Sequence, residues 1–325
     1  MIAKILPKPS KNFAGVQYNT NKVDRNKGEL MKTANFGPLD AMTNLRPQDY
    51  INYFQLVSAQ NKRIGNPQFH AVLSAKGKSY TKEELTKVAE AWLTLMGYGT
   101  QPYLIVFHKD TDNNHVHIVS TRVGRDGKKI SSAYEHVRSF NNLNQVLGYD
   151  HALRYRFSTR AQFYLLIERA GYLGKDYDEE KLQRKIDQFQ PDKERGSALR
   201  QLFIALNGVP NFGAVLKNQY GIELVFHCSE GKKPYGYTII DHDTQQVFKG
   251  SEVLNLKYLN GEVVYKTASD GDQPSPGEQS ENESLGEQYQ TPVYIGPIYI
   301  ADDVDDQQVL GMKRRRQKKA RTNTR

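Results

Sequence analysis

The sequence has very little cysteine and no long hydrophobic run. Cys228 is the single cysteine among 325 residues, so no disulfide can form within the chain. The longest apolar stretches, such as residues 103–107, have the length of a strand, far below the roughly 20 residues that a membrane-spanning helix needs. The apolar start is also too short for a signal peptide. These shortages predict a soluble protein of a reducing, cytoplasmic compartment, with no membrane insertion.

Basic side chains outnumber acidic ones by 45 to 36, and they are distributed unevenly. Residues 313–325 hold 8 basic and no acidic side chains, whereas residues 267–312 hold 10 acidic and no basic ones. Residues 1–266 therefore carry a net charge of +11. A basic folded region favours a polyanionic partner, because lysine and arginine that neutralise phosphates release condensed counterions. A merely solvated surface accounts for the charge about as well.

Composition divides the chain into three parts. Residues 1–150 form the first predicted domain, and residues 151–266 form a helical and β-rich extension that either grips nucleic acid or binds a partner. Residues 267–325 are predicted to be a disordered, flexible acidic linker and basic tail, because Pro, Gly, Ser, Gln and Glu dominate its first half. An apolar island at residues 292–300 is expected to be a short partner-binding or docking strand.

Strands and helices do not alternate regularly along the sequence. Residues 68–74, 102–107 and 115–121 read as strands, and the last two form an antiparallel hairpin around the polar loop 109–114. Thr81 and Glu84 form a capping box that opens a helix ending near Gly97. Further patterns predict helices around 45–60, 138–170, 178–188 and 194–206, and a β-rich stretch over 221–249. This order predicts an α+β fold with a central antiparallel sheet and flanking helices.

Three of the eight histidines lie within ten residues, at His108, His115 and His117. Residues two apart on a strand share a face, so the last two present their imidazoles side by side, and the hairpin turn brings His108 beside them. Three neutral imidazoles suit a divalent transition metal and leave coordination positions open for a substrate oxygen. The spacing predicts a catalytic metal site rather than ordinary strand histidines. Asp110 and Asp112 are then candidates to orient an imidazole or to take a proton.

The segment HKDTDNNHVH at residues 108–117 resembles the three-histidine motif of the relaxase, or mobilisation nuclease, family (MobA/VirD-like), part of the HUH endonuclease superfamily. Residues 13–19 (FAGVQYN) are similar to the family's motif that carries the nucleophilic tyrosine, here Tyr18. Residues 69–74 (FHAVLS) are similar to the motif whose serine contacts DNA, here Ser74. Together the motifs span residues 13–123, about a third of the chain.

The resemblance implies a site- and strand-specific DNA relaxase that nicks single-stranded DNA at a transfer origin, for conjugative mobilisation of a plasmid or mobile element. Tyr18 would attack one phosphodiester, giving a 5′-phosphotyrosyl link and a free 3′-OH, and the reverse reaction would rejoin the strand. The implied cofactor is a divalent metal ion, Mg²⁺ or Mn²⁺ with Zn²⁺ as a further option. The implied partners are single-stranded DNA, accessory relaxosome proteins and a secretion coupling protein.

The resemblance leaves two assignments open. His108 is either the third metal ligand or a base that activates Tyr18, and the hairpin geometry favours the ligand, which leaves the proton to Asp110. His70 is interpreted as structural. The residues expected to contact phosphates are Ser74, Lys76, Lys78, Arg122 and Arg125, together with Lys128, Lys129, Asn19, Asn21 and Lys22.

Three other functions compete with this prediction. A rolling-circle replication initiator of the same superfamily shares the histidine pair, but usually places its tyrosine on a helix after the histidines, whereas Tyr18 precedes them. A zinc-dependent hydrolase unrelated to DNA would need no tyrosine. A non-enzymatic DNA-binding protein with a structural metal would bind DNA without nicking it.

Overall fold

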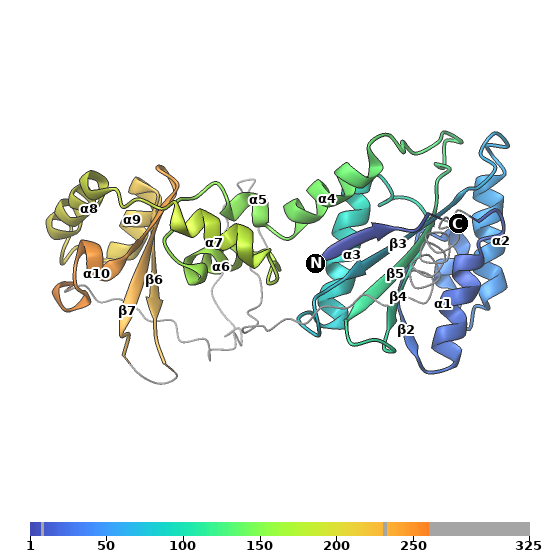
Figure 1. Ribbon diagram of the computed structural model, residues 1–325, viewed down its shortest axis with the longest axis horizontal. Coiled ribbons are helices and arrows are strands. Elements are labelled where there is room, and N and C mark those ends of the chain that lie inside the picture. The colour runs from blue at the N-terminus through green and yellow to red at the C-terminus, as the bar shows by residue number, and fades with distance from the viewer. Residues whose placement is uncertain (8–9, 230–232, 260–325) are drawn as a thin grey trace, which may run out of the picture. The chain divides into compact units, whose positions relative to one another are not determined.

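The computed structural model describes residues 1–7, 10–229 and 233–259, which form two compact units (Figure 1). Unit 1 contains residues 1–149 and 172–177, and unit 2 contains residues 150–171 and the described residues from 178 to 259. The linker and tail predicted over 267–325, including the apolar island, lie outside the described residues. No helix in the described part of the chain is long and apolar enough to cross a membrane.

A five-stranded antiparallel sheet forms the centre of unit 1. Its strands, in spatial order, are β1 (Ile2–Ile5), β3 (Gln68–Ser74), β5 (His115–Thr121), β4 (Tyr103–His108) and β2 (Gly28–Ala34). The predicted α+β fold and the predicted β4–β5 hairpin are confirmed. The two edge strands were not predicted, because β1 has four residues and the half-exposed β2 is interrupted by an irregularity between Leu30 and Lys32.

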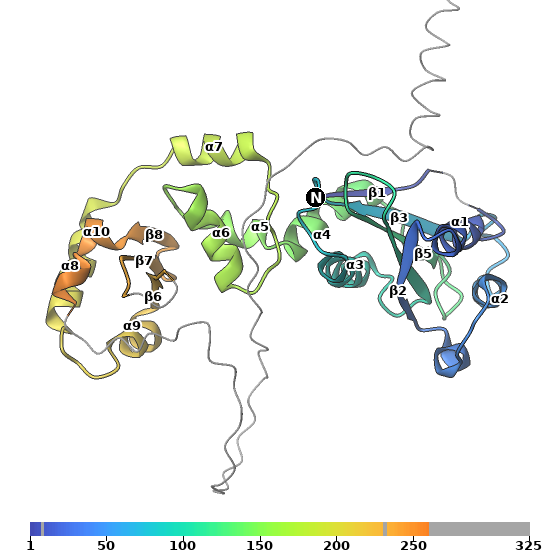
Figure 2. The same cartoon turned by 90° about the horizontal axis from the view of Figure 1, so that it is seen from below.

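Helices cover both faces of this sheet (Figure 2). On one face lie α1 (Ala14–Asp24) and α2 (Pro47–Ser58), and on the other lie α3 (Lys82–Met96) and α4 (Glu135–Val146). The capping box of α3 is formed as predicted, and Gly97 ends the helix with a φ of +89°, a conformation that favours glycine. A short 3₁₀ helix, η1 (Gly37–Ala41), precedes α2.

The alternation of side chains along the central strands decides what each helix pair covers. Leu104, Val106 and Val119 pack under α1 and α2 against a cluster of buried aromatic and aliphatic residues. Phe69, one residue out of phase, stacks instead on Tyr98 on the α3 side, with ring centroids 4.0 Å apart. The three histidines are in phase with Val106 and Val119, so they lie on the face that α1 covers.

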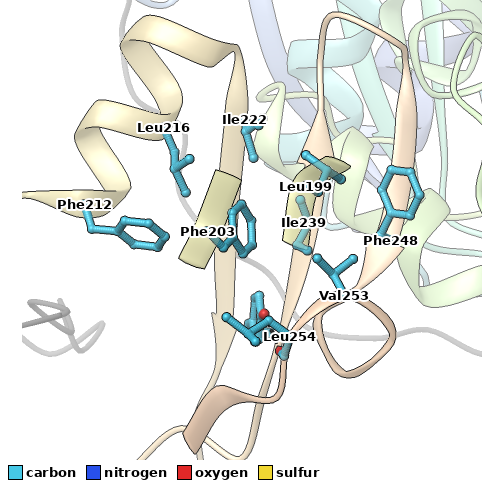
Figure 3. Close-up of a cluster of buried hydrophobic side chains, with 10 residues drawn as sticks. Leu199, Phe203, Phe212, Leu216, Ile222, Ile239, Phe248, Val253 and Leu254 are labelled. Carbon is cyan, nitrogen blue, oxygen red and sulfur yellow. Dashed lines mark hydrogen bonds between the residues drawn. The ribbon is translucent and has the colours of Figure 1, made fainter. Parts of the chain in front are cut away.

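Unit 2 contains a three-stranded antiparallel sheet in the order β6 (Ile222–His227), β7 (Gly236–Asp241) and β8 (Gln246–Lys249). Figure 3 shows its core, in which side chains of β6, β7 and β8 meet those of three helices. The helices at and within this unit are α5 (Tyr149–Ala152), α6 (Arg160–Arg169), α7 (Glu179–Asp187), α8 (Lys193–Ala205), α9 (Phe212–Tyr220) and α10 (Gly250–Val253), followed by the 3₁₀ helix η2 (Leu256–Tyr258).

The helical patterns predicted around 138–170 correspond to three separate helices, α4, α5 and α6. Gly148, with a φ of +75°, follows the end of α4, and the extended residue Arg156 then pairs with Gln246 at the edge of β8. Helix α9 was not predicted. The β-rich stretch predicted over 221–249 is confirmed.

Candidate metal centre

The three predicted metal ligands come together at one end of the β4–β5 hairpin. His108 and His115 lie directly opposite one another, and His117 follows two residues later on the same face. One ligand nitrogen from each ring lies within 4.8 Å of the other two, and all three side chains are buried. Among the described residues, this is the one group of three or more histidine, cysteine or acidic side chains that could hold a metal ion.

Burial favours the neutral form of two of these imidazoles. Burial, followed by the charge of neighbouring His115, lowers the pKa of His108 to about 3. Burial likewise holds the pKa of His117 well below its usual value. The rings of His108 and His117 therefore each offer a lone pair to a cation at physiological pH, since an imidazole binds metal in its neutral form. Three imidazole nitrogens within 4.8 Å of one another fit a divalent transition metal.

Hydrogen bonds determine which ring nitrogen is offered to a metal. Nδ1 of His115 lies 3.0 Å from the carbonyl oxygen of Asn113, which can only accept, so this nitrogen carries the hydrogen and Nε2 has the lone pair. Nε2 of His108 lies 2.9 Å from Oδ1 of Asn19. Because Nδ2 of Asn19 donates to the Gly15 carbonyl at 2.7 Å, its oxygen faces His108 and leaves Nδ1 of that ring as the ligand atom.

His70 is a fourth imidazole beside the cluster. Its Nε2 lies 3.0 Å from Nδ1 of His117, and burial lowers the pKa of His70 to about 4. His70 therefore contacts a candidate ligand from outside the group of three. The signal in the sequence is the alternation on β3: once β3 pairs with β5, His70 and Ser74 share the face of the three histidines.

Tyr18 lies on α1 directly above the cluster. Its ring centroid is 5.9 Å from that of His108 and 5.8 Å from that of His117, and its side chain is half-buried. One helical turn later, Nζ of Lys22 lies 5.7 Å from the Tyr18 ring centroid and forms an ion pair with Asp110. Burial by itself raises the pKa of Asp110, but the hydrogen bond and charge of Lys22 bring it below the ordinary value.

Besides Lys22 and Asn19 on α1, three of the residues expected to contact phosphates lie at the histidine end of the sheet. Ser74 ends β3 directly opposite His115, and it is buried. Lys76 and Lys78 follow in a loop that is fixed by hydrogen bonds between Gly77 and residues 113–114, at 2.6 and 2.8 Å. Asn19, which was expected to contact the DNA backbone, is fully buried and bonds His108 instead.

The two arginines lie at the other end of the sheet. They follow β5, which extends over about 20 Å from His115 to Thr121 at roughly 3.3 Å per residue. Arg122 forms a double ion pair with Glu135, at 2.7 and 3.0 Å, and packs on Phe69 on the α3 face. Arg125 donates to the carbonyl of Asn35 at 2.6 Å. The structure therefore does not bring these arginines to the histidine cluster.

Comparison with known families gives a match within unit 1 and the start of unit 2. Residues 18–153 match the model of the relaxase family described as "MobA/VirD2-like, nuclease domain". The matched range begins at Tyr18, includes the three histidines and ends close to the boundary of unit 1. A search of curated proteins found no match for the chain. The resemblance inferred from the sequence motifs is confirmed over the matched range.

Proposed function

We propose that this chain nicks single-stranded DNA at a transfer origin in a site- and strand-specific manner. Its residues 18–153 form a relaxase nuclease domain, which makes it a DNA-nicking enzyme. One observation carries the proposal: the Tyr18 ring lies 5.8 Å from the ring of His117, within a buried group of three imidazoles. A nucleophile and a cation site at this separation can act on the same phosphate.

In the proposed reaction, Oη of Tyr18 attacks the phosphorus of one phosphodiester and the bond from phosphorus to O3′ breaks. The products are a 5′-phosphotyrosyl link and a free 3′-OH, whose proton comes from solvent. Asp110 accepts the phenolic proton, and His108, His115 and His117 are the residues that would hold a divalent cation. When bound, this cation supplies positive charge that stabilises the phosphate oxygens in the transition state. The covalent link conserves the phosphodiester energy, so the reverse reaction rejoins the strand without an external cofactor.

Ser74, Lys76 and Lys78 are proposed to contact the phosphates that flank the nick, because they lie at the histidine end of the sheet. Arg122 and Arg125 are left out of this role because of their position at the other end. The reaction would serve conjugative mobilisation of a plasmid or mobile element in the cytoplasm, together with relaxosome proteins and a secretion coupling protein. Since Tyr18 precedes the histidines, a relaxase is favoured over a replication initiator.

The test is the detection of the covalent intermediate. The protein is incubated with labelled single-stranded oligonucleotides from its own mobile element, with and without Mn²⁺ or Mg²⁺, and analysed on a denaturing gel. The Tyr18→Phe variant should form no protein–DNA adduct and still bind DNA, whereas the matched variant Tyr53→Phe should form as much adduct as the parent. An unchanged adduct in Tyr18→Phe would place the nucleophile elsewhere. DNA binding without any adduct would support a non-enzymatic protein, and metal-dependent turnover without DNA would support a hydrolase.

A further inference from the structure

Unit 2 has a basic groove that the nuclease domain does not explain. The groove has a volume of about 630 Å³, and none of the residues that line it is acidic. The lining residues used below are Arg156, Lys181, Arg184, Lys185, Gln188 and Phe189. A concave surface with four cationic side chains and no carboxylate favours an anionic ligand.

One wall of the groove is a helix face. Lys181, Arg184, Lys185 and Gln188 follow one another at i, i+3, i+4 and i+7 along α7 and the residue that caps it (Figure 2), so they form one continuous stripe. The Asp178 side chain caps the helix by accepting from the backbone N–H of Lys181 at 3.0 Å. The cations are therefore presented from regular, capped structure.

A second part of the groove lining is tied to the sheet of unit 2. The backbone N–H of Arg156 donates to the carbonyl of Gln245 at 2.8 Å, and its carbonyl accepts from Val247 at 2.9 Å. The next residue, Phe157, is buried and also lines the groove, with Nζ of Lys185 5.5 Å from its ring centroid. Hydrogen bonds and packing thus fix this side of the groove before a ligand binds.

The positive charge of the groove is only weakly compensated. Nζ of Lys181 lies 3.8 Å from a carboxylate oxygen of Asp178, and the Arg156 guanidinium lies 3.8 Å from Asp192. Half-exposed pairs at such distances contribute little. Nε of Arg184 donates to the carbonyl of Glu180 at 3.2 Å, and Nζ of Lys185 donates to the carbonyl of Leu153, so these partners are neutral backbone groups. The Arg156 guanidinium likewise donates to the carbonyl of Gln190 at 3.0 Å. Because neutral carbonyls do not cancel charge, the groove keeps a net positive charge towards a ligand.

We infer that this groove binds the backbone of single-stranded DNA, as a contact separate from the histidine cluster. The inference rests on the proposed function, because it takes the strand that the nuclease domain nicks as the ligand. A cationic stripe tracks phosphates, and the half-buried ring of Phe189, beside the exposed amide of Gln188, offers a base a surface for stacking and hydrogen bonding. A second contact on the same strand raises overall affinity through effective concentration.

The test is DNA binding by the full chain in EDTA, where metal-dependent nicking is suppressed. Fluorescence anisotropy with a labelled single-stranded oligonucleotide compares the parent with Lys181→Ala/Arg184→Ala, two exposed positions. The variant should bind more weakly, and the slope of log affinity against log salt should fall by about 1.4, because each lost phosphate contact on a single strand contributes about 0.7. Unchanged affinity and slope would overturn the groove assignment.

The matched control is Arg200→Ala/Lys257→Ala, which removes the same charge from exposed positions outside the groove lining. This control should bind like the parent. An equal loss of DNA affinity in both double variants would show that only net charge matters, and would overturn the inference. A duplex of the same sequence that binds more tightly than the single strand, and loses that affinity in the groove variant, would overturn the assignment to single-stranded DNA.

Adduct formation separates this inference from the proposed function. The groove variant should form the tyrosyl adduct at the parental rate under saturating DNA and show a raised KM. If no oligonucleotide gives an adduct but the groove variant still loses DNA affinity, the nicking proposal is wrong and the assignment of the groove to DNA binding is supported. If adducts form and the groove variant binds DNA as the parent does, the assignment of the groove is wrong and the nicking proposal is supported.

Discussion

Oδ1 of Asn19 accepts a hydrogen bond from Nε2 of His108 over 2.9 Å. Asn19 is fully buried on α1, one residue after Tyr18, and the bond therefore joins the tyrosine helix to the end of β4. The Gly15 carbonyl holds the Asn19 amide in the orientation that presents its oxygen. A single side chain thus sets the tautomer of one candidate ligand and helps to fix the helix above it.

Asn19→Ala should weaken Mn²⁺ binding by about 10–100-fold, the range typical for loss of an outer partner of a metal-bound histidine. Without the acceptor, His108 can place its hydrogen on Nδ1 and turn its lone pair away from the site. Isothermal titration of the full chain with Mn²⁺ measures the change, with thermal unfolding recorded in parallel.

Two variants control for this change. Asn19→Asp keeps an oxygen acceptor and should retain most of the affinity, and Gln17→Ala alters an exposed position of the same helix and should bind as the parent does. A normal Mn²⁺ affinity in a folded Asn19→Ala protein would show that Asn19 does not set the tautomer.

Lys76→Ala/Lys78→Ala should weaken binding of single-stranded DNA and reduce its salt dependence, because both residues follow β3 at the histidine end.

Arg122→Ala should act differently and lower the free energy of unfolding by about 3 kcal/mol, since it leaves the largely buried Glu135 without its partner. Anisotropy and urea denaturation on both variants distinguish the two effects. An Arg122→Ala protein of parental stability that has lost DNA affinity would reverse this assignment.

The sequence predicted those parts of the fold that depend on local pattern. The hairpin from Tyr103 to Thr121 and the capped helix from Thr81 to Gly97 follow from alternation, turn residues and caps, and both are present. Strands β1 and β2 pair with β3 and β4 far along the chain, and their own residues alternate poorly. Their existence depends on tertiary pairing, which no local window contains.

The candidate site likewise has a part that the sequence predicted and a part that depends on tertiary packing. His108, His115 and His117 meet because of spacing within one hairpin, which the sequence displays. The contacts of Asn19 and His70 require the packing of α1 and the register of β3 against β5, so their roles became visible only in three dimensions. Tyr18 is one of 20 tyrosines, and only the family resemblance selected it. The distance of Arg122 and Arg125 from the cluster was not visible in the sequence, because closeness in sequence to the histidines does not reveal which end of the sheet a residue occupies.

Mn²⁺ should support adduct formation at a concentration at least about 10-fold lower than Mg²⁺, because imidazole nitrogens suit transition metals whereas Mg²⁺ prefers oxygen ligands. The measurement is adduct yield against metal concentration after treatment with EDTA. His115→Ala and His117→Ala should each abolish the adduct at every concentration. Equal activation by the two metals, or full activity in either variant, would contradict a three-imidazole site.

Glu223→Gln should lower the stability of unit 2 in a pH-dependent way. Glu223 is buried on β6, where it lies 2.7 Å from Nε of Arg169 and 3.3 Å from Nε2 of His242. Burial by itself raises the pKa of this carboxyl, but the hydrogen bond with His242 and the charge of Arg169 together lower it to about 2. A pKa below the ordinary value of 4.5 means that the ionised form stabilises the fold above pH 4.5, and that this contribution is lost as pH falls towards 2.

The variant should therefore unfold with a free energy about 1–2 kcal/mol below the parent at pH 7, a value reduced by solvent screening of the partly exposed Arg169. The gap should narrow steadily between pH 4.5 and pH 2, because the parent loses its carboxylate over that range. Urea denaturation of the parent and the variant at several pH values measures this difference in the free energy of unfolding. Glu252→Gln, which removes an exposed carboxylate paired with Lys249 at 3.5 Å, should change stability by less than about 0.5 kcal/mol. A gap for Glu223→Gln that stays constant down to pH 3 would show that the carboxylate's charge does not stabilise this unit.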